Sequence, residues 1–124
     1  MRALVIDDSA TTRKILKRML AKLGFEDTVE AANGQEGLDR LREMVTSDLV
    51  LVDWNMPVMD GISFVRAVRS DREFDSIPLV MVTTNNDIES VGQALEAGAS
   101  EFIMKPFTED VIREKLELLG GVQV

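Results

Sequence analysis

Three short and uniformly apolar runs constrain this chain more than any other feature of its sequence. They occupy residues 3–6 (Ala-Leu-Val-Ile), 49–52 (Leu-Val-Leu-Val) and 79–82 (Leu-Val-Met-Val). Because apolar and polar residues do not alternate within them, the runs are typical of parallel strands that are covered on both faces. Two weaker strand candidates complete the set: the more polar run 28–31, which suits a sheet edge, and the brief run 102–104.

Amphipathic helical patterns separate these runs. Between residues 9 and 23 one apolar stripe is expected, and Gly24 follows where a helix often stops. Three later helices are expected after polar residues that can cap a first turn, and all three carry apolar side chains at helical spacing. The stripe of the first helix comprises Ile15, Leu16, Met19, Leu20 and Leu23; the later caps and stripes are Asn33 with Leu38, Leu41 and Val45, Asp60 with Ile62, Val65 and Val68, and Thr108 with Val111, Ile112, Lys115, Leu116 and Leu119.

One more helix is expected from about Asn86 to Ala97, with Gly98 ending it. Its apolar residues are spaced to share one side, and we expect that side to face inward. Acidic residues are expected on the outer side, which favours a partner with a basic patch. The inward residues are Ile88, Val91 and Leu95, and the outward ones are Asp87, Glu89 and Glu96.

Five strands that alternate with five helices predict an α/β fold with a doubly wound parallel sheet and right-handed crossovers. The chain has 124 residues, which suits one such domain. In sheets of this kind, ligands bind beyond the carboxyl ends of the strands. The residues that follow the apolar runs are therefore the candidates for a functional site.

Polar side chains follow four of the predicted strands. Asp7 and Asp8 follow the first strand, Asp53 the third, Thr83 the fourth and Lys105 the fifth. The predicted topology gathers all of them at one edge of the sheet. Two carboxylates about 5 Å apart repel each other by roughly 3 kcal/mol at an effective dielectric constant of 20. A cluster of three therefore predicts a bound cation, and Mg²⁺ suits oxygen ligands.

Composition narrows the chemistry further. The chain has no cysteine and no histidine, which excludes disulfides, thiolate metal sites and an imidazole base. A formal charge of -8 argues against a nucleic-acid surface. No apolar stretch suits a signal peptide or a membrane span, so we expect a cytoplasmic protein without membrane insertion.

With Mg²⁺ present, Asp53 can attack phosphorus while Lys105 and Thr83 hold phosphoryl oxygens.

Four motifs together resemble the receiver domain of two-component response regulators, and most of all its stand-alone, CheY-like chemotaxis type. The resemblance spans nearly the whole chain and implies a flavodoxin-like (βα)5 fold with strand order 2-1-3-4-5. It also implies that residues 1–124 form a single receiver domain with no output domain. The motifs are Asp7-Asp8-Ser9, residues 53–61 (Asp-Trp-Asn-Met-Pro-Val-Met-Asp-Gly), Thr83-Thr84 and Lys105-Pro106-Phe107.

The resemblance also implies roles for single residues. Asp53 would accept a phosphoryl group from a histidine kinase, and Lys105 and Thr83 would contact that group. Thr83 and Phe102 would form the switch, which changes partner affinity at the surface of the fourth helix, fifth strand and fifth helix. The Mg²⁺ ligands would be Asp7, Asp8, Asp53 and the backbone of Asn55, and the side chains of Asn55 and Asn85 would tune the lifetime of the phosphoryl group.

The expected function is thus that of a phosphorelay response regulator in chemotaxis and motility. We do not expect an enzyme that acts on an external substrate, because the domain would catalyse only its own phosphorylation and dephosphorylation. Expected partners are the kinase and a downstream effector, such as a flagellar motor protein or a phosphatase, and the expected state is a monomer that binds no nucleic acid. Two residues depart from the commonest family pattern. Thr84 stands where a small residue is usual, and Phe102 lacks the hydroxyl of a common tyrosine.

Other interpretations stay open at this point. The chain could be a receiver module from a larger regulator. A metal-dependent phosphatase with an aspartate nucleophile would use similar groups, although such enzymes usually carry Asp-x-Asp and a cap domain. A flavodoxin-like flavin carrier would use hydroxyls near Ser9, but Asp7 and Asp8 would repel its phosphate. Single residues also have plainer roles: Asp7-Asp8-Ser9 could cap a helix, and Phe102 could simply fill the core.

Overall fold

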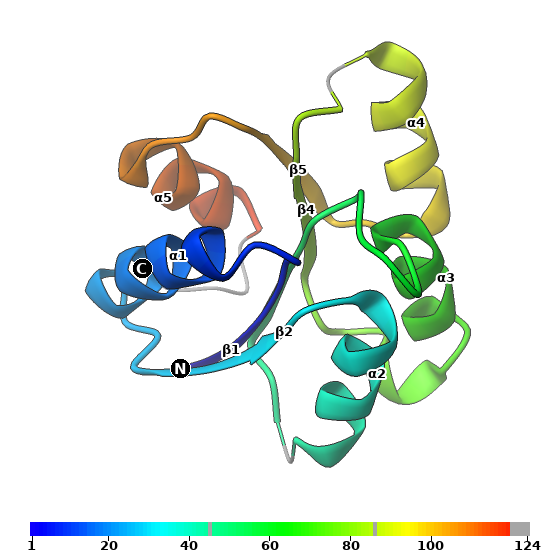
Figure 1. Cartoon of the computed structure of the whole chain (residues 1–124), viewed down its shortest axis with the longest axis horizontal. Coiled ribbons are helices and arrows are strands. Elements are labelled where there is room, and N and C mark those ends of the chain that lie inside the picture. Colours follow the sequence, from blue (N-terminus) through cyan, green and yellow to red (C-terminus); the bar gives the residue numbers. More distant parts are fainter. Residues whose placement is uncertain (45, 86, 120–124) are drawn as a thin grey trace.

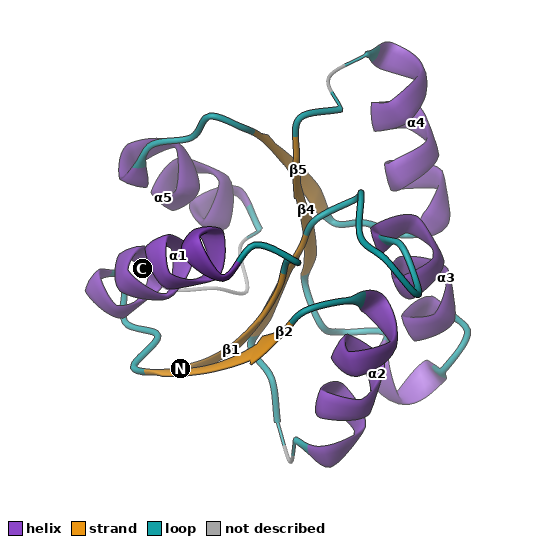
Figure 2. Cartoon of the chain, viewed as in Figure 1, coloured by secondary structure: helices purple, strands orange, loops and turns teal. Residues whose placement is uncertain are grey.

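The computed structural model describes residues 1–44, 46–85 and 87–119, and it confirms the predicted alternation of strands and helices (Figure 2). One element was not predicted, the short 3-10 helix η1 (Arg72–Phe74). The strands are β1 (Arg2–Ile6), β2 (Asp27–Ala31), β3 (Leu49–Val52), β4 (Leu79–Thr83) and β5 (Glu101–Met104). The helices are α1 (Ala10–Lys22), α2 (Gly34–Glu43), α3 (Gly61–Arg69), α4 (Ile88–Ala97) and α5 (Glu109–Leu118).

The five strands form one parallel sheet in the order β2-β1-β3-β4-β5, as the family resemblance implied. The central strand β3 is buried at every position, and so is β4. This burial explains why both runs are apolar without alternation, since each face of the sheet is covered by helices. The more polar β2 lies at an edge, where a strand has one neighbour only.

Two helical layers cover the sheet, with α1 and α5 on one face and α2, α3 and α4 on the other (Figure 1). Alternate residues of β1 serve the two cores, because successive side chains of a strand point to opposite faces. Ala3 and Val5 pack with Leu16 and Ile112 of the first layer, whereas Leu4 packs with residues of the second layer. No helix among the described residues is long and apolar enough to cross a membrane.

A side-chain cap begins each of the five α-helices. In every case the capping oxygen accepts the backbone N–H of the third residue along, which satisfies a donor that the first turn leaves free. The predicted caps of α2, α3 and α5 are confirmed; α4 is capped by Asp87, and the expected start at Asn86 lies outside the described residues, as does Val45. The caps are Ser9, Asn33, Asp60, Asp87 and Thr108.

The predicted inner side of α4 is wrong in two of its three residues. Ile88 is 92% exposed and Leu95 is 50% exposed, while Ala94 is the buried residue of this helix. The reason is the position of α4 at the edge of the sheet, where it packs against α3 and β5. Ile15 of α1 is likewise 41% exposed rather than buried. Gly98 ends α4 as predicted, with a φ of 115° that favours glycine.

Candidate functional site

Three carboxylates meet at the carboxyl edge of the sheet. One oxygen of each of Asp7, Asp8 and Asp53 lies within 4.8 Å of the other two. The register of the sheet explains this proximity, because Ile6 at the end of β1 pairs with Val52 at the end of β3. Asp7 and Asp53, the residues that follow, therefore leave neighbouring strands side by side. The predicted acidic cluster is confirmed.

Asp53 is the most constrained of the three. It is 8% exposed, its backbone N–H donates to the carbonyl of Ile6 at 2.9 Å, and its Oδ1 accepts the N–H of Trp54 at 2.8 Å. Burial raises the pKa of Asp53 above its usual range; the Lys105 ammonium opposes this shift, and the Asp7 carboxylate adds to it. The ionised form of Asp53 is thus costly in the absence of a further cation.

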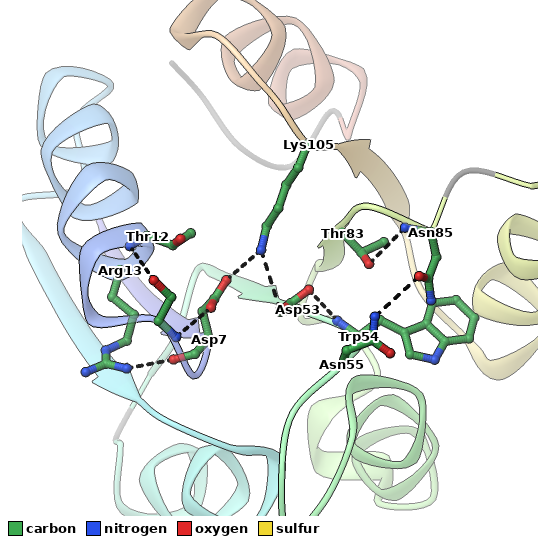
Figure 3. A network of polar contacts seen from close by, with 10 residues as sticks. Asp7, Thr12, Arg13, Asp53, Trp54, Asn55, Thr83, Asn85 and Lys105 are labelled. Carbon is green, nitrogen blue, oxygen red and sulfur yellow. Dashed lines mark hydrogen bonds and ion pairs between the residues drawn. The ribbon is translucent and has the colours of Figure 1, made fainter.

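Lys105 bridges two of the carboxylates (Figure 3). Its Nζ lies 3.0 Å from Oδ2 of Asp7 and 3.5 Å from Oδ2 of Asp53. The backbone N–H of Lys105 donates to the carbonyl of Thr83 at 2.9 Å, which ties its segment to the end of β4. Three carboxylates and one ammonium still leave a net negative charge at the site. The structure therefore brings together Asp7, Asp8, Asp53 and Lys105, as the sequence predicted.

Asp7 also belongs to the start of α1. Its Oδ1 accepts the N–H of Ser9 at 2.9 Å, and Ser9 in turn caps α1 through the N–H of Thr12. The capping interpretation of this segment is therefore confirmed alongside the acidic cluster, because different atoms serve the two purposes. Asp7 is 2% exposed, whereas Asp8 is exposed.

Arg13 is a supporting residue that the sequence did not reveal. Its Nη1 donates to the carbonyl oxygen of Asp7 at 2.7 Å (Figure 3). Its Nε lies 3.2 Å from Oε1 of Glu30. It thus fastens the end of β1 to α1 and β2. In the sequence Arg13 is one of several basic residues between apolar positions, and nothing distinguishes it from a solvated arginine.

Thr83, Asn85 and Asn55 form the other side of the site. Thr83 is fully buried, and its Oγ1 accepts the N–H of Asn85 at 3.2 Å. The Oδ1 of Asn85 accepts Nδ2 of Asn55 at 3.3 Å, so the loops after β3 and β4 are joined by side chains. The two asparagines that we expect to tune the lifetime of the phosphoryl group are therefore in contact. Thr84 is exposed.

The loop between β3 and α3 depends on a glycine and a strained residue. A Cβ on Gly61 would overlap the carbonyl oxygen of Asp53, and the Gly61 N–H donates to the carbonyl of Trp54 at 2.8 Å. Val58 has a φ of 68° in a turn that the N–H of Met59 closes onto the carbonyl of Pro57 at 2.7 Å. This φ is unfavourable for a β-branched residue, and Val58 is 82% exposed.

Phe102 lies among core side chains on β5, paired with Met81 of β4, and is 7% exposed. This placement satisfies the core-packing interpretation, and the role of Phe102 as a switch stays a prediction. The Lys105–Pro106 peptide bond is cis. The site residues thus come from the ends of β1, β3, β4 and β5, the edge at which parallel sheets bind ligands.

The donor set can be tested against a divalent cation. All available charged donors are carboxylate oxygens, which hard cations such as Mg²⁺ prefer. Two of the carboxylates are buried, and burial opposes ionisation of Asp53 unless positive charge is close. These properties fit Mg²⁺, and they do not fit a soft metal that needs sulfur or imidazole.

Known proteins are similar to this chain in sequence and in fold. A family model described as "Response regulator receiver domain" matches residues 3–117. The chemotaxis protein CheY1 of Helicobacter pylori is 45% identical over 121 residues, which are 98% of each chain. The chemotaxis protein CheY of Pseudomonas aeruginosa is 40% identical over 117 residues, 94% of each chain.

Two solved structures extend the comparison. The chemotaxis protein CheY4 of Vibrio cholerae aligns with a TM-score of 0.87 and 30% identity, covering 95% of this chain and 97% of its own. A chain of the CheX–CheY–BeF3–Mg²⁺ complex of Borrelia burgdorferi aligns with a TM-score of 0.90 and 26% identity, covering 97% of this chain and 89% of its own.

Proposed function

Because the chain belongs to the response regulator receiver domain family, we propose that Asp53 is the residue that accepts the phosphoryl group. The protein is a chemotaxis-type two-component response regulator. The observation that carries the assignment is the position of Asp53: it is buried at the end of β3, between two other carboxylates and 3.5 Å from Lys105. A metal-dependent phosphatase is not favoured.

The proposed reaction is a transfer from a phosphohistidine of the kinase. An oxygen of Asp53 forms a bond to phosphorus as the bond from phosphorus to the donor nitrogen breaks, and the electron pair of that bond stays on the imidazole. The product is an aspartyl phosphate. Lys105 and the hydroxyl of Thr83 are proposed to stabilise the phosphoryl oxygens, because transfer of this group depends mainly on positioning and charge neutralisation.

Mg²⁺ is proposed to be held by Asp7, Asp8, Asp53 and the backbone carbonyl of Asn55. When bound, it supplies positive charge that offsets the carboxylates and the incoming phosphoryl group. The protein contributes the rest. Asp7 is fixed by the Ser9 N–H and by Lys105, and Asp53 Oδ1 is oriented by the Trp54 N–H, which leaves Oδ2 directed toward Lys105.

Two further roles are proposed for the residues after β4. Thr83 would shift toward the phosphoryl group and Phe102 would rearrange with it, so that the surface of α4, β5 and α5 changes its affinity for partners. Asn55 and Asn85 would set the lifetime of the phosphoryl group, and their mutual hydrogen bond supports a shared effect on access to Asp53. In both proposals the site catalyses only two reactions, the phosphorylation of Asp53 and the hydrolysis of the resulting aspartyl phosphate.

The proposed partners are a histidine kinase and a downstream effector, such as a flagellar motor protein or a phosphatase. The likeness to a chain of a CheX–CheY complex supports a partner of this kind. We further propose that residues 1–124 act as a single receiver domain, monomeric and cytoplasmic, without binding nucleic acid.

Labelling tests the assignment of Asp53. The purified protein, incubated with Mg²⁺ and acetyl phosphate, should gain a phosphate that hydroxylamine releases, and Asp53→Asn should abolish the label. Asp39→Asn, an exposed aspartate on α2, serves as the control and should label normally. Persistence of the label in Asp53→Asn would place the phosphoacceptor elsewhere.

A further inference from the structure

Arg13 holds the peptide unit that joins Asp7 to Asp8. The carbonyl oxygen of this unit accepts Nη1 of Arg13 at 2.7 Å (Figure 3), a distance typical of charge-assisted hydrogen bonds. The peptide unit before Asp7 is fixed separately, because the Asp7 N–H donates to the carbonyl of Ala31 at 3.1 Å. The contact with Arg13 therefore orients the chain where it leaves Asp7 toward Asp8.

Asp8 depends on this peptide unit for its place in the acidic cluster. Its side chain is exposed, and within residues 1–44, 46–85 and 87–119 no hydrogen bond or ion pair holds its carboxylate. One of its oxygens nevertheless lies within 4.8 Å of oxygens of Asp7 and Asp53. Carboxylates repel each other at such distances, so attraction within the cluster does not keep Asp8 there. The backbone to which Asp8 is attached has to do so.

The guanidinium of Arg13 makes two contacts at once. Nη1 donates to the carbonyl of Asp7, and Nε donates to Oε1 of Glu30 on β2 at 3.2 Å. The guanidinium is planar and rigid, and the Arg13 side chain is only 18% exposed, so the contact with Glu30 fixes the direction of Nη1. A lysine has a single ammonium group and cannot hold both partners in this geometry.

Glu30 also keeps the positive charge of Arg13 off the acidic cluster. Among the described residues Arg13 forms its ion pair with Glu30 and none with the three clustered aspartates. An arginine paired with those aspartates would compete with a divalent cation for the same oxygens. The pairing with Glu30 thus lets Arg13 hold the backbone of the site and leaves the carboxylates to the cation.

From these contacts we infer that Arg13 is a positioning residue for the Mg²⁺ site. Acting through the peptide unit of Asp7 and Asp8, it directs the Asp8 carboxylate into the cluster, and Glu30 orients Arg13 for this purpose. Residues that hold metal ligands in place without touching the metal typically change its affinity 10–100-fold when they are replaced. The inference rests on the proposed function, in which these carboxylates bind Mg²⁺.

A titration of the full chain with Mg²⁺, followed by the fluorescence of Trp54, tests the inference. Trp54 is the only tryptophan, and its backbone N–H donates to Oδ1 of Asp53. Arg13→Met and Arg13→Lys should each raise the Kd for Mg²⁺ at least about tenfold. Removal of a positive charge alone would lower this Kd, so the sign of the change in Arg13→Met separates positioning from simple charge.

Matched variants provide the controls at about 0.15 M salt, where exposed charges are screened. Lys17→Met removes the same charge from α1, and Lys17 also faces Glu30, at 3.9 Å; the Kd should stay within about twofold. Glu30→Gln should raise the Kd at least about threefold, because Arg13 loses its charged partner. Glu36→Gln, an equal change of charge beside the same hollow, should raise it less than about twofold.

Three outcomes would overturn the inference. They are an unchanged or lower Kd in Arg13→Met, wild-type affinity in Arg13→Lys, and equal effects of Glu30→Gln and Glu36→Gln. Circular dichroism in chelator shows whether the Arg13 variants fold. If they do not, Glu30→Gln carries the test, because Glu30 lies on the edge strand β2 with its side chain 34% exposed.

Acetyl phosphate labelling at increasing Mg²⁺ provides an independent measurement. The Mg²⁺ concentration for half-maximal labelling should rise in the Arg13 variants by the same factor as the Kd. Partial unfolding would lower the amount of label without moving that concentration. Failure of the proposed function is distinguishable, because it would leave the label in Asp53→Asn whatever the Mg²⁺ affinity of the Arg13 variants.

Discussion

Neutralising Asp53 should stabilise the protein when no divalent cation is present. Asp53→Asn removes a carboxylate that is buried beside Asp7 and Asp8, yet keeps an oxygen that can accept the Trp54 N–H. Because the substitution is nearly equal in size, its main effect is electrostatic. The variant thus measures the free energy that the acidic site costs the fold.

Distances in the structure give the magnitude. The carboxylate oxygens lie within 4.8 Å of one another, and at that limiting distance and an effective dielectric constant of 20 each neighbour repels Asp53 by roughly 3.5 kcal/mol. The Lys105 ammonium at 3.5 Å attracts it by roughly 4.7 kcal/mol. Repulsion exceeds attraction by roughly 2 kcal/mol, and burial of the charge acts in the same direction. We expect Asp53→Asn to raise the unfolding free energy by on the order of 2 kcal/mol, or Tm by about 8 °C.

The sign of the pH dependence follows from the raised pKa of Asp53. The folded state holds this proton more tightly than the unfolded state, so the resulting stability is present below the unfolded pKa and is lost as pH rises through the folded pKa. At a pH above the folded pKa of Asp53 the wild type has lost this stability, and the variant should be the more stable. Toward acidic pH, where Asp53 of the wild type is protonated, the difference should shrink.

Urea unfolding followed by circular dichroism measures the difference, first in a chelator and then in Mg²⁺. Cation binding to the folded wild type should narrow or reverse the gap, because the variant has lost a ligand. Asp39→Asn is the control and should change stability by less than about 0.5 kcal/mol. If Asp53→Asn were no more stable than the wild type in chelator, the account of the acidic site as a source of repulsion would be wrong.

Four further substitutions test single positions. Gly61→Ala should destabilise the fold by more than about 2 kcal/mol, because its Cβ would overlap the Asp53 carbonyl, whereas Gly92→Ala should stabilise it by about 0.5–1 kcal/mol; urea titrations compare the two, and equal effects would contradict the close approach at Gly61. Val58→Gly should raise stability by about 1 kcal/mol by relieving a positive φ, and a thermal melt that shows a loss would contradict that strain. Lys105→Met should lower the rate of acetyl phosphate labelling at least about 100-fold, and an unchanged rate would exclude a role of Lys105 at the phosphoryl group.

The arrangement of the acidic site could be predicted because it follows from topology and strand ends alone. Asp7 and Asp53 each come directly after a strand that is apolar throughout, and parallel strands end at the same edge. No side-chain conformation enters that argument. It therefore holds even though the strand bounds differ by a residue, as in β5, which begins at Glu101 rather than Phe102.

The supporting contacts could not be predicted, because they depend on where long side chains reach. Arg13 spans from α1 to the carbonyl of Asp7, six residues away, and to Glu30 on another strand. Asn55 and Asn85 meet across 30 residues of chain. Each of these residues is a polar residue of a common type, and its position in the sequence is not unusual. A single sequence does not show which of many polar neighbours such a side chain contacts.

The error on α4 has a different physical cause. Helical spacing shows that Ile88, Val91 and Leu95 share a side, but it does not say what lies against that side. When a helix lies between two neighbouring helices, its apolar side lies against the core. Helix α4 lies at the sheet edge, so its apolar side is wider than the surface that the sheet and α3 can cover. Ile88 and Leu95 therefore stay exposed, although helical spacing places them on the same side as Val91.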